Sequence, residues 1–373
     1  MQNIKIISFG LLGALCAPAV YAFQVGVFDL TPTATIQEKY DDNIASSGTN
    51  TKDDFITLLT LGLSGVHETK TDSLKLSGSI TQKVFAKEHD FNTVSELLSA
   101  KYKKEFSEHD RITFNNSFIH ADESTSFKDE FGRASGRYDY YKNICDLGLE
   151  HDFTEQFTAK LKYANEFYDP TINTVSRSIL NKPGVELDYA FSSKTIGSMF
   201  YDYSNRVFDP GGTVSIHSTA VGVRRFLSSN IYVDAKSGAD FIHTIDDTDT
   251  VRPSYSLGLT DELDETSHAG ISFTKSYNVN YFSKDLFNSW SVALNWGKQL
   301  AQRLYFYTGA FTGVGKFSGG SKENFYGLNL GFDYEFRSNM KAVAGYSFTR
   351  RDSSVSGQDY DKNTVTLGMT INF

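Results

Sequence analysis

Apolar and polar residues alternate along most of the chain, in segments that end at turn-forming residues. The pattern is clear in 73–85 and 325–338, and clearest in 364–373 at the carboxyl terminus. A period of two over ten or more residues is typical of a β-strand with one apolar and one polar face. The chain is therefore predicted to be rich in long strands.

About eighteen such segments can be placed, with 16 as the alternative count. The segment 213–226 breaks the alternation, and 194–206 fits poorly in either register. The fold class predicted is all-β, a transmembrane up-and-down antiparallel β-barrel. The predicted strands are 32–41, 54–66, 73–86, 93–106, 110–121, 136–150, 156–168, 182–191, 194–206, 213–226, 230–242, 253–263, 267–281, 287–299, 302–314, 324–337, 340–350 and 362–373.

The connections between these segments alternate in length. The connections 42–53, 122–135 and 351–361 are long, whereas the one around 69–71 is a tight turn. Short periplasmic turns and longer external loops are typical of outer-membrane barrels. An even number of strands then places both termini on the periplasmic side.

The first residues are predicted to be removed as a signal peptide. Lys5 supplies a positive charge, 6–17 is apolar, and Val20 and Ala22 place small residues at the −3 and −1 positions of a cleavage site. The domain organisation predicted is a signal peptide at 1–22, followed by one outer-membrane β-barrel at 23–373.

Strand length and aromatic content favour a membrane barrel over a soluble sandwich. Strands in soluble proteins run about 5 or 6 residues, whereas a spanning strand needs roughly 9 to 11. Aromatic residues make up 14% of the chain, and Tyr40, Tyr102 and Tyr334 lie near predicted strand ends, as girdle residues do. Lipid offers no hydrogen-bond partner, so a spanning sheet must close on itself.

The last residues resemble the C-terminal signal of bacterial outer-membrane barrels. That signal ends in an aromatic residue and has apolar residues at alternate positions before it. The resemblance implies that the barrel assembly machinery is a partner of this strand. The matching residues are Val365, Leu367, Met369, Ile371 and Phe373.

A second resemblance lies at the start of the mature chain. A Pro-led strand runs into Tyr40-Asp41-Asp42-Asn43, and 53–57 then begins a second strand. This opening resembles that of the beta-barrel porin 2 family. Some members of that family are associated with exopolysaccharide export, so the resemblance implies a conduit for polysaccharide and polysaccharide export components as partners. It implies no catalytic residue.

Charged residues with the parity of the polar face are predicted to line the lumen, because a charge that faces lipid costs about 2–4 kcal/mol at mid-depth. Two groups emerge, which predict a basic wall opposite an acidic wall; the alternative is mutual neutralisation in a filled lumen. The basic wall comprises Lys75, Lys83, Lys101, Lys103, Arg111, Lys160 and Lys162, and the acidic wall comprises Glu186, Asp188, Asp202, Asp234, Asp240, Asp333 and Glu335.

Composition excludes several other functions. The net charge of −9 argues against nucleic-acid binding. The 8 histidines are scattered without metal-ligand spacing, so no metal or cofactor is expected. His217 and Ser218 are adjacent in a strand and point to opposite faces, which excludes them as a catalytic pair. We expect no enzymatic activity and regard Cys145 as a lipid-facing bystander.

These observations predict a passive channel or conduit in the outer membrane of a Gram-negative cell. It would contact outer-membrane lipid and lipopolysaccharide, and would pass exopolysaccharide or other polar solutes. The alternative is a structural or surface-contact barrel with a closed lumen.

Overall fold

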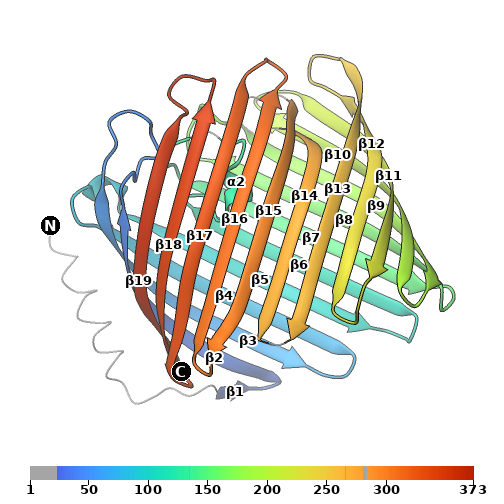
Figure 1. Ribbon diagram of the computed structural model, residues 1–373, viewed down its shortest axis with the longest axis horizontal. Coiled ribbons are helices and arrows are strands. Elements are labelled where there is room, and N and C mark those ends of the chain that lie inside the picture. The colour runs from blue at the N-terminus through green and yellow to red at the C-terminus, as the bar shows by residue number, and fades with distance from the viewer. Residues whose placement is uncertain (1–22, 134, 265, 280–283, 285) are drawn as a thin grey trace.

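The computed structural model describes residues 23–373 except 134, 265, 280–283 and 285, so the predicted signal peptide, 1–22, lies outside the described residues. Its sheet has 19 strands, all but the first of which form a closed ring (Figure 1). The strands are β1 (Phe23–Val25), β2 (Phe28–Asp41), β3 (Asp54–Glu68), β4 (Asp72–Phe85), β5 (Thr93–Glu105), β6 (Asp110–Ala121), β7 (Tyr140–Asp152), β8 (Phe157–Pro170), β9 (Arg177–Ser192), β10 (Thr195–Asp209), β11 (Thr213–Phe226), β12 (Ile231–His243), β13 (Asp249–Asp264), β14 (Ser267–Val279), β15 (Leu286–Ala301), β16 (Leu304–Phe317), β17 (Lys322–Arg337), β18 (Met340–Ser353) and β19 (Tyr360–Asn372).

Each strand from β2 to β19 pairs antiparallel with its sequence neighbours, and β19 pairs with β2 to close the ring. Each of these strands overlaps one of the predicted segments, which confirms the predicted fold class and the count of eighteen. The short strand β1 was not predicted; it forms a hairpin with the start of β2, where Phe23 pairs with Leu30. Two short helices lie in connections: η1 (His89–Phe91) and α2 (Phe127–Glu130).

The segment that broke the alternation is β11, and its inner face explains why. Val214 and Ile216 are buried there against Phe208 and Ile242. Tyr277 of β14 and Leu286 of β15 pack on this cluster from within the barrel. The apolar residues of β11 therefore face inward at the loop end, at Val214 and Ile216, and outward further along, at Val221 and Val223. This change of face within one strand breaks the alternation.

The outer face of the barrel forms an apolar belt. Leu61, Met199 and Leu367 are 53%, 62% and 61% exposed, and they belong to a large set of exposed apolar side chains on the ring. A water-soluble monomer rarely exposes so much apolar surface. A closed sheet with an apolar exterior is the form in which β-structure spans a bilayer, because every backbone hydrogen bond is satisfied within the ring.

The two ends of the barrel differ. The connections 193–194, 302–303 and 338–339 are short and lie at the end where Phe23 and Phe373 also lie. The longer connections 42–53 and 122–139 lie at the opposite end. We call these the turn end and the loop end.

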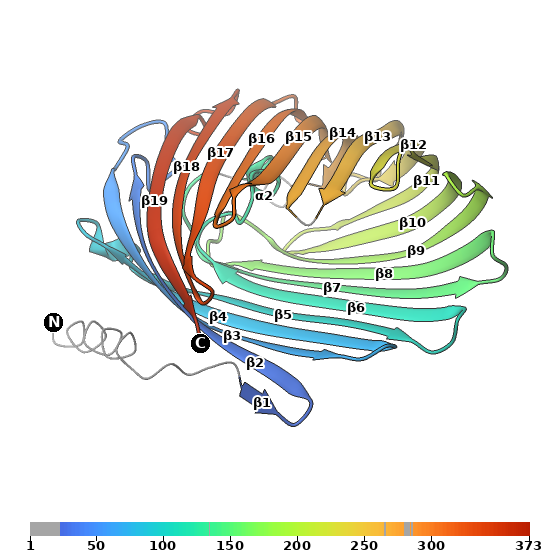
Figure 2. The same ribbon diagram turned by 60° about the horizontal axis from the view of Figure 1, so that its bottom comes forward.

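One long connection folds into the barrel instead of away from it. Residues 122–139, here called the inner loop, leave β6 and return to β7, yet they contact β15 to β19 on the other side of the ring. Glu123 pairs with Lys362 of β19, and Phe131 packs on Phe311 of β16. Figure 2 shows α2, which belongs to this loop, inside the ring.

Candidate functional site: a lumen narrowed by the inner loop

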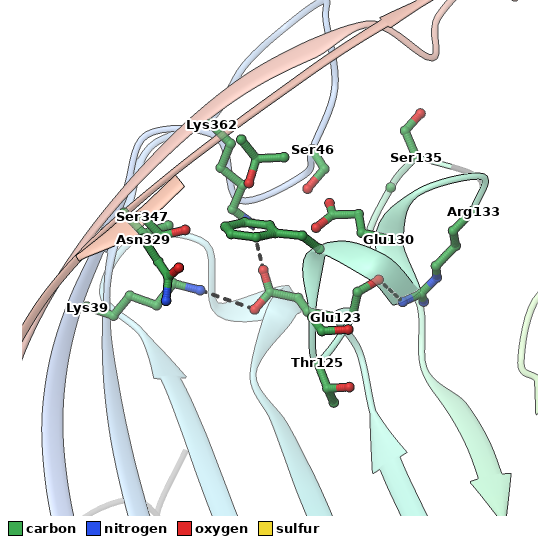
Figure 3. A pocket seen from close by; sticks show the side chains of 16 residues that line it. Lys39, Ser46, Glu123, Thr125, Glu130, Arg133, Ser135, Asn329, Ser347 and Lys362 are labelled. Carbon is green, nitrogen blue, oxygen red and sulfur yellow. Dashed lines mark hydrogen bonds and ion pairs between the residues drawn. The ribbon is translucent and has the colours of Figure 1, made fainter. Parts of the chain in front are cut away.

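One side of the inner loop is fixed by ion pairs. The Glu123 carboxylate lies 2.6 Å from Lys362 Nζ and 3.2 Å from Lys39 Nζ, and Figure 3 shows it between these two strand residues. Arg137, at the far end of the loop, lies 2.7 Å from the same carboxylate. These groups form the ionic anchorage, which also includes Asp122, paired with Lys83 and Arg137, and Asp41.

The charges around Glu123 control its protonation. Burial raises the pKa of the Glu123 carboxyl, but attraction to Arg137, Lys362 and Lys39 outweighs burial and lowers that pKa well below its ordinary value. Glu123 is therefore ionised at neutral pH. The Glu123 side chain is 24% exposed, and an ionised carboxylate that is largely removed from water depends on its cationic partners, so the ionic anchorage acts as one unit.

The other side of the inner loop is fixed by aromatic packing. Ser126 caps α2 by accepting a hydrogen bond from the Asp129 backbone N–H at 3.1 Å. The following turn places Phe127 and Phe131 on one face. The Phe131 ring centroid lies 5.0 Å from that of Phe287 and 5.6 Å from that of Phe311.

Glycines in the facing strands make room for these rings. A Cβ atom on Gly327 would lie 2.6 Å from the Phe127 ring, and one on Gly313 would lie 2.7 Å from the Phe131 ring. Both distances are shorter than side-chain contacts allow, so the close approach of α2 requires glycine there. The aromatic anchorage comprises Phe127, Phe131, Phe287, Phe311 and Phe325, with Gly313 and Gly327.

A buried ion pair lies beside the aromatic anchorage. Glu323 and Arg351 are 1% and 3% exposed, and Glu323 Oε2 lies 2.6 Å from Arg351 Nη2. The other Glu323 oxygen accepts a hydrogen bond from the Gly132 backbone N–H at 2.9 Å. Gly132 has a φ of +82°, which is the left-handed region that favours glycine. The pair therefore binds the backbone of the inner loop directly.

The register places every predicted lumen charge on the inner face. Paired residues of neighbouring strands share a face, and Lys83 faces inward because it contacts Asp122 of the inner loop. The pairings of Lys75 with Lys101, Arg111 with Glu150, and Lys160 with Glu186 then extend this face around the ring. By the same alternation, Lys103, Lys162, Asp188, Asp202, Asp234, Asp240, Asp333 and Glu335 also face inward.

Ion pairs weaken the predicted contrast between a basic wall and an acidic wall. Lys160 Nζ lies 2.9 Å from Glu186 and 2.6 Å from Asp188, so members of the two predicted walls are neighbours on adjacent strands. Other predicted lumen charges pair with residues outside the predicted sets: Arg111 with Glu150 and Asp152, Asp234 with Arg224, and Asp333 with Lys341. Such pairing cancels much of a field across the lumen.

Two lysines at the turn end are an exception. Lys75 and Lys101 are register partners on the inner face. Among the described residues, the only carboxylate that comes within 4.0 Å of Lys75 Nζ is that of Glu68, at 4.0 Å. Like charges side by side in a sheet are destabilising, so this pair contributes uncompensated positive potential to the lumen.

The inner loop divides the lumen near the loop end. A cavity of about 460 Å³ lies between the loop and the strands that carry Lys39, Asn329 and Lys362. A larger cavity of about 540 Å³ lies on its other side, bounded by the loop and by strands from β6 to β16. A third, of about 400 Å³, lies on the inner wall of β6 to β10 and includes Lys160 and Asp202.

Sequence reasoning missed the residues that shape this lumen. Glu123 and Phe131 belong to the connection 122–135, which was predicted only as a long loop. Arg137 was assigned to the predicted strand 136–150, which is wrong at its start because β7 begins at Tyr140.

One pattern could have pointed to the inner loop: the inner positions within 309–315 of β16 and 325–331 of β17 carry no charge. They include Gly313, Gly327 and Phe325, whereas the inner positions of other strands carry charges. An uncharged, glycine-lined inner wall indicates that something packs against it.

The predicted assembly residues lie on the outer face. Val365 and Leu367 are exposed to the surroundings of the barrel, and Met369 and Ile371 share their parity along β19. The Phe373 backbone N–H donates to the Pro32 carbonyl at 2.9 Å, next to the seam where the ring closes. Cys145 also faces outward, since it pairs with Asn165 and Asn116 on the face opposite Asp146.

Among the described residues, no helix is long and apolar enough to cross a membrane. Within the same residues, no group of three or more His, Cys, Asp and Glu side chains could hold a metal ion.

An apolar belt, a charged lumen and a connection folded into that lumen are together features of a transmembrane β-barrel of the outer-membrane type. No family model and no curated protein matches the chain, so the resemblance to the beta-barrel porin 2 family stays a prediction.

Solved structures give a distant match. The chain is similar to OccK1 (OpdK) from Pseudomonas aeruginosa, at 10% identity and a TM-score of 0.49, over 92% of this chain and 99% of that one. It is also similar to OccAB4 from Acinetobacter baumannii, at 11% identity and a TM-score of 0.48, over 92% and 98% of the two chains. The siderophore receptor PirA from Pseudomonas aeruginosa matches at 10% identity and a TM-score of 0.48, over 92% and 80%. We infer no solute or partner from these values.

Proposed function

We propose that this protein is a passive outer-membrane channel for small polar solutes, with the inner loop setting the width of the path. The observation that carries the proposal is the 540 Å³ cavity beside a loop that is fixed on both sides. A barrel with a filled, structural lumen needs no such space. Both termini would face the periplasm and the loop end the outside, where it would meet lipopolysaccharide.

Single-channel recording in a planar bilayer tests this proposal. Purified protein should give stable openings, because water and ions can pass beside the loop. Phe131→Ala should raise the conductance, since it loosens the aromatic anchorage. Phe336→Ala is the matched control, because Phe336 is an exposed aromatic residue on the outer face at the turn end. Assembled barrels without conductance would instead favour the structural or surface-contact alternative.

Export of exopolysaccharide is a narrower form of the same proposal and is supported only by the family resemblance. If a polymer threads the lumen, a soluble acidic polysaccharide added on one side should interrupt the current of the open channel. Monosaccharides of the same type, at equal mass concentration, provide the control. An undisturbed current with the polymer would limit the proposal to small solutes.

We also propose that the barrel assembly machinery recognises β19. Deletion of Phe373 should leave unassembled chain in the periplasm, because the aromatic terminus that completes the series of alternate apolar residues is lost. Heat-modifiable migration in outer-membrane fractions measures assembly. Phe336→Ala again serves as control, and normal assembly of the deletion variant would contradict the proposal.

A further inference from the structure

The largest cavity has two chemically different walls. Five basic residues line one part of it, against a single acid, Asp129. Arg206 and Lys142 of this set are already close to Glu166, at 2.9 Å and 3.6 Å. The basic residues are Lys128, Arg133, Lys142, Lys182 and Arg206.

Two of these cations remain accessible to a solute. Lys128 lies on α2, is exposed, and makes no salt bridge within 4.0 Å among the described residues. The side chain of Lys182 on β9 is 42% exposed, and among the described residues the only carboxylate within 4.0 Å of it is that of Asp202, at 3.7 Å. Both side chains can turn toward an anion in the cavity without breaking a short ion pair.

Other parts of the cavity lining carry hydroxyl groups, which lie on β11, β14 and β15. No lining residue from these three strands is charged. In the described part of the chain, no side-chain hydrogen bond involves Ser218, Ser272, Thr274, Ser289 or Ser291. A nearby acid, Asp240, pairs with Ser218 in register but is only 6% exposed and does not line the cavity. The hydroxyl wall consists of Ser218, Ser272, Thr274, Ser276, Ser289 and Ser291.

Hydroxyl side chains both donate and accept hydrogen bonds, so a row of them matches a ligand that carries several hydroxyl groups. Accessible lysines match a negative group on the same ligand. We propose that the 540 Å³ cavity selects small anionic polyols, such as sugar acids, whose carboxylate meets Lys128 and Lys182 while their hydroxyls meet the hydroxyl wall. This inference rests on the proposed channel function and specifies its solute class.

Current block by defined solutes tests the proposal. The probes are gluconate, which has both features, glucose, which lacks the charge, and acetate, which lacks the hydroxyls. Gluconate should block the wild-type channel at the lowest concentration of the three. Sulfate is a fourth probe, because a plain anion site would bind it as well as it binds gluconate.

Two pairs of variants separate the walls. Lys128→Gln with Lys182→Gln should raise the half-blocking concentration of gluconate about tenfold or more, since a charge-assisted hydrogen bond is lost. Lys75→Gln with Lys101→Gln is the matched control, because it removes the same charge from the lumen outside this cavity. Its long-range effect on gluconate is screened by salt, so the half-blocking concentration should change less than about twofold. Ser272→Ala with Ser291→Ala should weaken block by gluconate roughly threefold and leave block by acetate unchanged.

The outcomes distinguish the two proposals. A chain that assembles and does not conduct contradicts the channel itself. A chain that conducts, but in which gluconate blocks no better than glucose, contradicts the solute class alone. Equal effects of the two lysine pairs on block by gluconate would also overturn the proposed solute class. So would equal block by sulfate and gluconate that does not change in the serine variant.

Discussion

The inner loop is fixed on its two sides by different interactions. At the ionic anchorage, Glu123 lies among Lys39, Lys362 and Arg137. At the aromatic anchorage, Phe127 and Phe131 pack against rings and glycine backbone. The first depends on the ionisation of carboxylates, whereas the second depends on shape and on apolar area removed from water.

This difference shows how a long connection can be held against the inner wall of a barrel by two kinds of contact. Charged pairs fix orientation, but each partner carries a desolvation cost that only its counterpart offsets. Aromatic packing adds stabilisation that pH does not change. A loop that has both anchorages keeps one of them under conditions that weaken the other. Variants of single residues should distinguish the two anchorages, and the largest effect is expected first.

The largest effect is expected from Glu323→Ala. The substitution leaves the buried Arg351 guanidinium without its carboxylate and removes the acceptor for the Gly132 N–H. Breaking a buried pair in this way costs about 3–5 kcal/mol, so the aromatic side of the loop should undock. Hydrogen exchange of the loop amides measures this loss. Glu335→Ala, on the exposed inner face of the same strand, should change exchange little; equal effects of both variants would contradict the assignment.

A smaller effect is expected from Gly327→Val. The added side chain would occupy the space of the Phe127 ring, and overpacking of this kind costs about 1–3 kcal/mol. Helix α2 should shift away from β17 and the single-channel conductance should change. Gly345→Val on β18 is the control, because a Cβ there meets only the Leu330 carbonyl oxygen at 3.7 Å. A channel that tolerates both substitutions equally would show that the aromatic anchorage does not set the path.

The contribution of the ionic anchorage to the stability of the docked loop should depend on pH. Because the pKa of Glu123 is lowered in the folded chain, its contribution is complete above the ordinary Glu pKa of about 4.3 and is lost as pH falls below that value toward the folded-state pKa. Loop protection in the wild type should therefore decrease below about pH 4. Glu123→Gln should weaken protection at neutral pH and reduce this decrease, whereas Phe131→Ala should keep the wild-type pH dependence. The same pH dependence in Glu123→Gln would exclude Glu123 as its source.

The barrel could be predicted from the sequence because its determinants are local. Alternation along each strand determines the two faces, and the turn residues between strands set their order, so the spans and the inward parity of Lys75 or Asp333 follow from neighbours in the chain. The inner loop could not be predicted, because its contacts join distant residues: the Gly132 N–H and Glu323 are 191 positions apart. Parity also gives the face of a charge but not its partner, which is why the neutralising neighbours of Lys160 were missed.

The smallest effect is expected from Cys145→Ser. This substitution tests whether only residues inside the barrel hold the inner loop in place. Cys145 lies on β7, five residues beyond Tyr140, where the inner loop rejoins the barrel, but it faces outward and touches neither anchorage. A lipid-facing thiol behaves as a small apolar group, and substitutions away from packed features usually change stability by less than about 0.5 kcal/mol. Conductance, loop protection and its pH dependence should all remain those of the wild type. A change in any of these three properties would mean that the outer face of β7 influences how the inner loop is held. The ionic and aromatic anchorages would then not be the only contacts that fix the loop.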